Sequence, residues 1–285
     1  MYKILVTGVN GQLGSEIRSI SSNYPYEFIF TDSKILDITD HSKIYGFLKS
    51  NNIDAIINCA AYTAVDKAET DVETANEVNH LAVKNLAESA KDLNITLIHI
   101  STDYVFNGES FQPYSEDSVC DPTSVYGSTK RDGEEAMISL MVPNSIIIRT
   151  SWVYSSYGKN FLKTMRRLGS EKSEVNVVDD QIGTPTYARD LAICILDILP
   201  KISNNETQIY HFSNEGVCSW YDFAISIMEL SAYNCQVNPI PSSQFPTPTK
   251  RPFYSVLSKS QIKADFGVTI PHWRQSLEEC IESLD

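Results

Sequence analysis

The sequence predicts an α/β protein in which a doubly wound parallel sheet is joined to a smaller C-terminal α+β lobe. In the first half of the chain, short uninterrupted apolar runs alternate with amphipathic segments. This alternation is typical of βαβ units whose parallel strands are buried on both faces. In the second half the alternation ends, and prolines separate shorter helical segments. The 285 residues suffice for one large domain or two small ones.

The first strand and the first helix differ in the period of their apolar residues. Residues 4–6 form a short apolar run, which predicts a strand. Residues 11–21 repeat apolar side chains every three to four positions, as one face of a helix does. We expect further strands at residues 28–30, 55–59, 96–100 and 146–148, and further helices at residues 44–48, 75–93 and 128–140. In such a sheet, ligands bind at the carboxyl ends of the strands.

The second half of the chain has a less regular pattern and no clear linker before it. A stretch rich in Pro, Ser and Thr at residues 239–252 predicts an ordered loop, and residues 220–230 and 273–284 predict helices. We divide the chain into residues 1–150 and 151–285, with part of residues 176–215 returning to the first unit.

The composition excludes several classes of protein. With 36 acidic and 23 basic residues, the net charge is −13, whereas nucleic-acid binders need a basic face to displace counterions. The same balance argues against an anionic membrane surface. No apolar stretch approaches the ~18 residues of a membrane span, and no cleavage site follows the short N-terminal apolar run, so we expect no signal peptide.

The six cysteines are scattered along the chain, and none forms a C-x-x-C pair. Their spacing suits neither a metal site nor a disulfide framework. We therefore expect no bound metal and a cytoplasmic protein whose thiols are buried and reduced.

Three glycines mark the junction of the first predicted strand and helix. The pattern is G-x-x-G-x-x-G rather than the G-x-G-x-x-G of the general dinucleotide fingerprint. Glycines permit the tight turn and let backbone N–H groups approach a pyrophosphate, and the helix N-terminus adds positive partial charge. The pattern predicts a Rossmann-like dinucleotide site. Its candidate residues are Gly8, Asn10, Gly11, Gln12, Leu13 and Gly14.

An acidic residue, Asp32, ends the second predicted strand. A carboxylate in this place hydrogen-bonds the ribose hydroxyls of NAD and repels the additional phosphate of NADP. The alternative is that Asp32 only caps a turn. Asp37 and Ile38 follow soon after and are candidates to flank the adenine. We expect NADPH or NADH as the cofactor, with a preference for NADH if Asp32 binds the ribose.

Tyr126 and Lys130 form a Y-x-x-x-K motif. In a helix this spacing places both side chains on one face. The lysine would favour the phenolate and lower the pKa of Tyr126 toward neutrality, which makes the tyrosine a usable general acid or base. Tyr45 and Lys49 have the same spacing but lie inside the second predicted helix, away from any strand end.

Thr102 is the predicted partner of Tyr126, because it stands where the fourth predicted strand ends. A hydroxyl there can hydrogen-bond a carbonyl oxygen beside the tyrosine. Thr102, Tyr126 and Lys130 are therefore the candidate catalytic residues.

With these motifs, the chain resembles the extended short-chain dehydrogenases/reductases and, among them, the dTDP-4-dehydrorhamnose reductase family. The matching segments follow one another in the order found in that family and cover almost the whole chain. They are residues 6–14, 58–69, 101–106, 126–130, 149–154, 180–186 and 246–252. The resemblance implies that residues 1–150 bind NAD(P) and that residues 151–285 form a substrate lobe.

The resemblance also implies a reaction. The C4 ketone of dTDP-4-dehydro-β-L-rhamnose would be reduced with NAD(P)H to dTDP-L-rhamnose, a precursor of polysaccharides. Tyr126 would be the acid, Lys130 would hold the nicotinamide ribose, and Thr102 would hydrogen-bond the sugar C4 oxygen. The partner is then a dTDP-sugar, with no nucleic acid or membrane, and the chain a monomer or homodimer.

Further site residues follow from the resemblance. Ala61, Tyr62 and Thr63 match the loop over the nicotinamide, although the family most often has His in place of Tyr62. Val65, Asp103 and Trp152 match the substrate site, with a purely core role as the alternative for Trp152. Arg251 is a candidate partner of the substrate diphosphate or a solvated surface charge.

Three other functions stay open from the sequence. The first is the same reduction of another 4-keto-6-deoxy sugar nucleotide. The second is a non-catalytic, cofactor-binding regulatory subunit like that of methionine adenosyltransferase, which resembles the same reductases. The third is an epimerase that holds NAD tightly. The presence of Thr102, Tyr126 and Lys130 favours an enzyme over a binding subunit.

Overall fold

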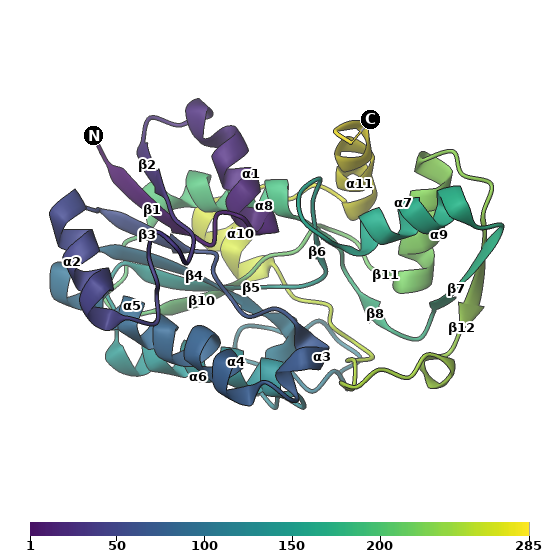
Figure 1. Cartoon of the computed structure of the whole chain (residues 1–285), viewed down its shortest axis with the longest axis horizontal. Helices are drawn as coiled ribbons and strands as arrows, with labels where there is room; N and C mark the ends of the chain where they lie inside the picture. Colours follow the sequence, from purple (N-terminus) through teal and green to yellow (C-terminus); the bar gives the residue numbers. More distant parts are fainter. Residues whose placement is uncertain (285) are drawn as a thin grey trace.

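A six-stranded, fully parallel sheet forms the centre of the computed structural model, which describes residues 1–284 (Figure 1). The strand order is β2-β1-β3-β4-β5-β10. The strands are β1 (Lys3–Thr7), β2 (Glu27–Phe30), β3 (Ala55–Asn58), β4 (Thr96–Thr102), β5 (Ser145–Thr150) and β10 (Gln208–His211). Their Ile, Leu and Val side chains are buried on both faces, as a sheet covered by two helical layers requires. The predicted fold class is confirmed.

Two layers of helices cover the sheet, one on each face (Figure 1). One layer contains α1 (Gln12–Ile20), α8 (Ala188–Ile198) and α10 (Ser260–Phe266). The other contains α2 (His41–Asn51), α5 (Ala82–Leu93) and α6 (Val125–Leu140). The sequence predicted α1, α2 and α6 but did not predict α8, α10 or β10.

The helix predicted over residues 75–93 is interrupted. It consists of α4 (Val72–Asn76), a π-helical segment η2 (Glu77–Leu81) and α5, and the short helix α3 (Val65–Ala68) precedes it. A π-helical turn shifts the side chains around it, and such turns are frequent at functional sites. Here the turn contains Asn79, which is fully buried against α6.

The start of α6 lies earlier than the sequence predicted. The hydroxyl of Ser124 accepts a hydrogen bond from the backbone N–H of Gly127 (3.1 Å) and caps the helix. The helix therefore begins at Val125 rather than at residue 128. As a result, Tyr126 and Lys130 both lie within it, one turn apart.

A second core forms the C-terminal lobe, on the right in Figure 1. Its helices are α7 (Phe161–Glu171), α9 (Trp220–Leu230) and α11 (Trp273–Glu282). Three two-stranded pairs complete it: β7 (Glu174–Val178) with β12 (Gln236–Ile240), β6 (Val153–Tyr154) with β9 (Thr186–Tyr187), and β8 (Ile182–Gly183) with β11 (Cys218–Ser219). The two helices predicted in this half are confirmed.

Short 3₁₀ segments complete the chain: η1 (Ser21–Asn23), η3 (Asp103–Val105), η4 (Leu199–Lys201) and η5 (Ser242–Gln244). Within residues 1–284, no helix combines the length and the apolar character needed to cross a membrane.

The sheet order explains where a ligand site forms. From β1 the chain goes to β2 on one side and then to β3 on the other. The loops that leave β1 and β3 therefore run in opposite directions from adjacent carboxyl ends, which opens a crevice at that edge.

Candidate active site

A cavity of about 900 Å³ lies at the carboxyl ends of β1, β3, β4 and β5 and reaches the C-terminal lobe. It brings together most of the residues that the sequence singled out. Its lining includes Gly8, Asn10, Gly11, Gln12, Leu13, Asp32, Asp37, Ile38, Ala61, Thr63, Val65, Thr102, Asp103, Tyr126, Lys130 and Trp152. Three candidates, Gly14, Tyr62 and Arg251, lie outside this lining.

The glycine turn forms one end of the cavity. Gly8 has a φ of 66°, and a Cβ atom there would lie 2.6 Å from the backbone N of Ala60. Only glycine permits this close approach of the loops after β1 and β3. Gly14 does not face the cavity because it packs on the turn itself, where a Cβ would lie 2.6 Å from the Gly8 carbonyl oxygen.

The N-terminus of α1 is suited to an anion. Its N-cap is Gly11, no side chain caps it, and its first turn contains no acidic residue. Gly11, Gln12 and Leu13 line the cavity. The first N–H groups of a helix lack partners within the helix and carry partial positive charge. This turn therefore fits the pyrophosphate of a dinucleotide cofactor.

Asp32 lies at the same end of the cavity, but its carboxylate is already used. It accepts hydrogen bonds from the Asn10 side chain (3.0 Å) and from the backbone N–H groups of Lys34 (3.0 Å) and Ile35 (3.2 Å). The sequence left two roles open for Asp32, a contact with the cofactor ribose or the capping of a turn. In the structure Asp32 caps the turn and also lines the cavity.

Tyr126 and Lys130 face the cavity from α6, and both are buried. The Lys130 ammonium donates to the carbonyl oxygen of Ile100 (2.6 Å) and lies 3.2 Å from His99 Nε2. Gly127 allows α6 to sit this close to the end of β4, since a Cβ there would lie 2.2 Å from the Tyr104 carbonyl oxygen.

The predicted lowering of the Tyr126 pKa is wrong for this structure. Burial raises the pKa of Tyr126 above its ordinary value; the hydrogen bond with Thr102 offsets this in part, and the charge of Asp103 adds to it. The groups that shift the pKa of Tyr126 do not include Lys130, whose Nζ donates to the Ile100 carbonyl oxygen and lies beside His99 Nε2. Burial in turn lowers the pKa of Lys130 to about 8, although the negative charge of Glu134 on the same helix acts to raise it.

Thr102 and Asp103 form the wall beside Tyr126. Thr102 Oγ1 donates to Asp103 Oδ1 (3.0 Å) and accepts from the backbone N–H of Tyr104 (3.2 Å). Asp103 is 3% exposed, and among residues 1–284 its Oδ2 has no partner at hydrogen-bond distance. Burial raises the pKa of Asp103 to about 7, against the hydrogen bond from Thr102. Asp103 as a residue lines the cavity, and its carboxyl also lies close enough to Ser255 for that side chain to lower its pKa.

The loop after β3 is held from behind. The side chain of Asn79 accepts from the backbone N–H of Tyr62 (2.9 Å) and donates to its carbonyl oxygen (3.1 Å). The Tyr62 hydroxyl donates to Asp71 (3.0 Å), which directs the ring away from the cavity lining. Asn79 was not singled out from the sequence, and the π-helical turn that contains it has no simple sequence signal.

Arg251 pairs with protein groups rather than facing the cavity. Its guanidinium forms an ion pair with Asp66 (2.6 Å) and donates to the Tyr104 hydroxyl (3.1 Å). Asp66 also accepts from the backbone N–H of Thr249 (3.2 Å). The loop around residues 246–252 is thereby fastened to the loop after β3, at the edge of the site.

Trp152 lines the cavity from the C-terminal lobe. Its φ is 49°, which is unusual for a bulky residue. Its ring stacks on Trp220 with centroids 3.7 Å apart, and a Cβ on Gly183 would lie 2.6 Å from the ring. Trp152 is therefore both packed in the lobe and exposed to the cavity, so the two alternatives from the sequence combine.

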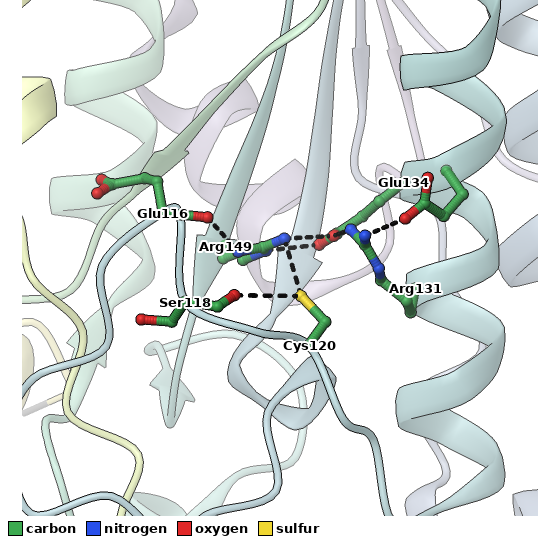
Figure 2. A network of polar contacts seen from close by, with 7 residues as sticks. Glu116, Ser118, Cys120, Arg131, Glu134 and Arg149 are labelled. Carbon is green, nitrogen blue, oxygen red and sulfur yellow. Dashed lines mark hydrogen bonds and ion pairs between the residues drawn. The ribbon is translucent and has the colours of Figure 1, made fainter.

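A buried ion pair fixes α6 against the sheet (Figure 2). Arg149 on β5 donates to both carboxylate oxygens of Glu134 on α6, at 2.9 and 2.7 Å. Glu134 also binds Arg131 (3.0 Å), and Arg149 reaches Cys120 Sγ (3.3 Å). Because both ends of the pair are buried, its bonds orient the helix that carries Tyr126 and Lys130.

The second Y-x-x-x-K pair lies elsewhere. Tyr45 and Lys49 are on α2, outside the cavity, with Lys49 Nζ 6.0 Å from the centroid of the Tyr45 ring. The structure thus separates two identical motifs by their position relative to the strand ends.

Comparison with known proteins places this site in a family. The model of the family described as "RmlD substrate binding domain" matches residues 2–285. The chain is 41% identical to "Spore coat polysaccharide biosynthesis protein SpsK" of Bacillus subtilis (strain 168), over 99% of this chain and 98% of the relative. It is also 41% identical to a dTDP-4-dehydrorhamnose reductase of Aggregatibacter actinomycetemcomitans, over 98% of each chain.

Solved structures agree with these sequence relatives. A crystal structure of dTDP-4-dehydrorhamnose reductase from Bacillus anthracis, in complex with NADP, superposes with a TM-score of 0.94. The identity is 36%, and the superposition covers 99% of this chain and 100% of that chain.

Proposed function

This chain belongs to the family described as "RmlD substrate binding domain", and from that premise we propose that it reduces dTDP-4-dehydro-β-L-rhamnose to dTDP-L-rhamnose with NADPH or NADH. The observation that carries the proposal is the cavity in which Thr102, Tyr126 and Lys130 meet the uncapped N-terminus of α1. The relative from Aggregatibacter actinomycetemcomitans, matched over 98% of each chain, is named dTDP-4-dehydrorhamnose reductase. That agreement favours a reductase over a regulatory subunit or an epimerase.

The residues present fit a nicotinamide dinucleotide. The first N–H groups of α1 would hold the pyrophosphate, Asp37 and Ile38 would flank the adenine, and Ala61 and Thr63 would lie beside the nicotinamide. When bound, the cofactor supplies the hydride that reduces the C4 ketone. Asp32 lies at the same end of the cavity and would be beside the adenosine ribose, with its carboxylate also bound by Asn10 and the backbone of the turn. The balance between NADH and NADPH is a matter for measurement.

The chain's own residues supply the proton and the orientation. Tyr126 donates its phenolic proton to the oxygen that develops at C4, and Thr102 hydrogen-bonds that oxygen and fixes its position. Lys130, as an ammonium, favours the phenolate that remains. The raised pKa of Tyr126 keeps it protonated before the reaction, which suits a general acid.

The substrate sugar lies between the two lobes. Asp103 Oδ2, buried and without a partner among residues 1–284, accepts from a sugar hydroxyl, and Val65 and Trp152 close the cavity around the ring. Arg251 reaches the diphosphate only if it exchanges its contact with Asp66.

We also propose that the chain acts as a monomer or homodimer in the cytoplasm and binds no nucleic acid. The acidic composition and the six cysteines, all free thiols, support this, because thiols stay reduced in that compartment.

The test of the function is a turnover assay on purified protein. Oxidation of NADPH or NADH is followed by absorbance with dTDP-4-dehydro-β-L-rhamnose as substrate. We expect Tyr126→Phe to lose about 10²- to 10⁴-fold in kcat while it binds the cofactor normally. Tyr45→Phe is the matched control and keeps wild-type turnover, because that tyrosine lies outside the cavity.

Two outcomes would overturn this proposal. Wild-type turnover in Tyr126→Phe would refute the role of the tyrosine. A wild-type protein that binds the cofactor but reduces only another 4-keto-6-deoxy sugar nucleotide would refute the substrate.

A further inference from the structure

Four buried polar side chains form a continuous line beneath the cavity, and the reaction described above uses only the last of them. Thr7 Oγ1 lies 2.6 Å from Asn58 Oδ1, Asn58 Nδ2 lies 3.0 Å from His99 Nδ1, and His99 Nε2 lies 3.2 Å from Lys130 Nζ. Each of the four residues is at most 1% exposed.

The sheet register produces this line. Thr7 on β1 is paired with Asn58 on β3, and Asn58 is paired with His99 on β4. Three adjacent parallel strands thus present polar side chains at the same level, in a sheet whose other side chains are mostly apolar. Burying a polar group is unfavourable unless the group is hydrogen-bonded. We therefore asked what role these four buried polar side chains have in the protein.

His99 is a neutral imidazole. Burial lowers its pKa well below the ordinary value, and the positive charge of Lys130 lowers it further. A neutral imidazole has one donor and one acceptor nitrogen. If the nitrogen that faces Lys130 accepts a hydrogen bond, the nitrogen that faces Asn58 must therefore donate one, and the reverse also holds.

Two arrangements satisfy every group in the line. If Lys130 is an ammonium, it only donates, so His99 Nε2 must accept and Nδ1–H must donate to the amide oxygen of Asn58. If Lys130 is a neutral amine, Nε2–H can donate to it, and Nδ1 then accepts from the amide nitrogen of Asn58. A half-turn of the Asn58 amide exchanges the two, because the Thr7 hydroxyl can donate or accept. In the structure the amide oxygen faces Thr7 and also accepts from the backbone N–H of Ala60 (3.3 Å); after the half-turn this N–H keeps only the Thr7 oxygen, at 3.4 Å.

We propose that His99 is a positioning residue for the reduction, whose tautomer, set with Asn58, holds Lys130 as an ammonium beside Tyr126. In this role Nε2 accepts one Lys130 proton and the Ile100 carbonyl accepts a second, at 2.6 Å. The third N–H of the ammonium remains for the site. The inference rests on the proposed function.

Of the groups around Lys130, His99 is the one that can keep it protonated. Among residues 1–284, Glu134 on the same helix shifts the pKa of Lys130, His99 on β4 contacts its Nζ, and Tyr126 lies one turn earlier on α6. Glu134 favours the ammonium, but its carboxylate is already bound by Arg149 and Arg131. Burial alone would make Lys130 a weaker base, so the acceptor at Nε2 preserves its charge.

The first experiment compares pH profiles of kcat/KM. His99→Leu removes the acceptor, so the alkaline limb, which reports loss of the Lys130 proton, moves to lower pH by about one unit. At pH 8 this costs roughly fivefold in kcat/KM, because the protonated fraction of Lys130 falls from about one half to about one tenth. His99→Gln supplies an acceptor oxygen and restores the limb to within about 0.3 units. His211→Leu is the matched control: this imidazole on β10 is equally buried but bonds Tyr114, so its profile keeps the wild-type limb.

The second experiment observes the tautomer directly and needs no substrate. The ¹⁵N shifts of the His99 ring are recorded by NMR across pH 6 to 9. We expect the Nδ1–H form at pH 6 and conversion toward the Nε2–H form as Lys130 loses its proton. An unshifted limb in His99→Leu, or an Nε2–H tautomer that does not change with pH, would overturn the inference. Because the NMR result is independent of turnover, failure here is distinguishable from failure of the proposed function.

Discussion

Asp103 is a carboxyl that the fold holds under strong desolvation. Its folded pKa of about 7 lies above the ordinary value of 3.8 because the side chain is buried. The folded protein therefore binds this proton more tightly than the unfolded chain does. The stabilisation it gives is complete below about pH 4 and is lost as the pH rises through about 7.

Replacing Asp103 by Asn removes this pH dependence, because the amide does not titrate and still accepts from Thr102. We expect wild type to lose on the order of 2–4 kcal/mol of unfolding free energy relative to Asp103→Asn between pH 4.5 and 7.5. Urea unfolding at both pH values measures this, with the exposed Asp92→Asn as control. A constant difference between wild type and Asp103→Asn at the two pH values would contradict it.

At the residue scale, the sequence identified the groups that carry chemistry but not those that hold them. Tyr126 and Lys130 were recognisable because their spacing and place in the chain recur in known proteins. His99 lies between the apolar residues Ile98 and Ile100 of β4, and its contact with Lys130 depends on how α6 packs across that strand. Such a contact between distant segments has no local pattern in the sequence.

The helix α6 shows how an element sets the site. Two glycines on it, Gly127 and Gly133, allow backbone contacts that a Cβ would prevent, each with an oxygen 2.2 Å from that position. The first contact involves Tyr104, directly after Thr102 and Asp103. The distance between Tyr126 and Thr102 thus depends on a residue that itself does no chemistry.

We predict that Gly127→Ala destabilises the protein by about 1–3 kcal/mol, because α6 must move away from the Tyr104 carbonyl. The same movement lowers kcat. Gly46→Ala on α2 is the control: no atom lies within 4 Å of a Cβ there, and alanine favours an exposed helix by about 0.5–1 kcal/mol. Unfolding free energies of the two variants should therefore change in opposite directions, and a change of the same sign would refute the packing argument.

At the scale of elements, the strands were the most predictable. Uninterrupted apolar runs such as residues 55–57 and 146–148 favour a strand in a sheet buried on both faces. The break of the helix over residues 75–93 was not predictable, because the π-helical turn is stabilised by tertiary contacts of Asn79 with Tyr62 and Thr129. Likewise, α8 and β10 occur where the first-half pattern had ended. The sequence predicted that part of residues 176–215 returns to the first unit, but it did not predict these two elements or their packing on α1 and β5.

The whole molecule is held together by buried polar contacts between its two cores. Glu16 on α1 accepts from Ser155 in the segment after β6 (2.6 Å). Asp190 on α8 accepts from Ser276 on α11 (2.6 Å) and from Asn214 (2.6 Å). Removing all the partners of one of these buried groups leaves it unsatisfied, which costs about 1–3 kcal/mol. Separating the two cores would therefore be unfavourable in free energy, which favours unfolding of the chain as a single cooperative unit.

This coupling predicts how a ligand of one core affects the other. All three tryptophans, Trp152, Trp220 and Trp273, belong to the C-terminal lobe, whereas the glycine turn lies at the sheet. NADP⁺ at 100 times its Kd stabilises the folded state by about 2.7 kcal/mol, which raises Tm by roughly 5 °C for a chain of this size. If the cores unfold together, the midpoint from tryptophan fluorescence rises by the same amount as the midpoint from far-UV circular dichroism. A fluorescence midpoint that stays constant while the dichroism separates into two transitions would show two independent units, and would mean that the buried contacts between α8 and α11 do not couple them.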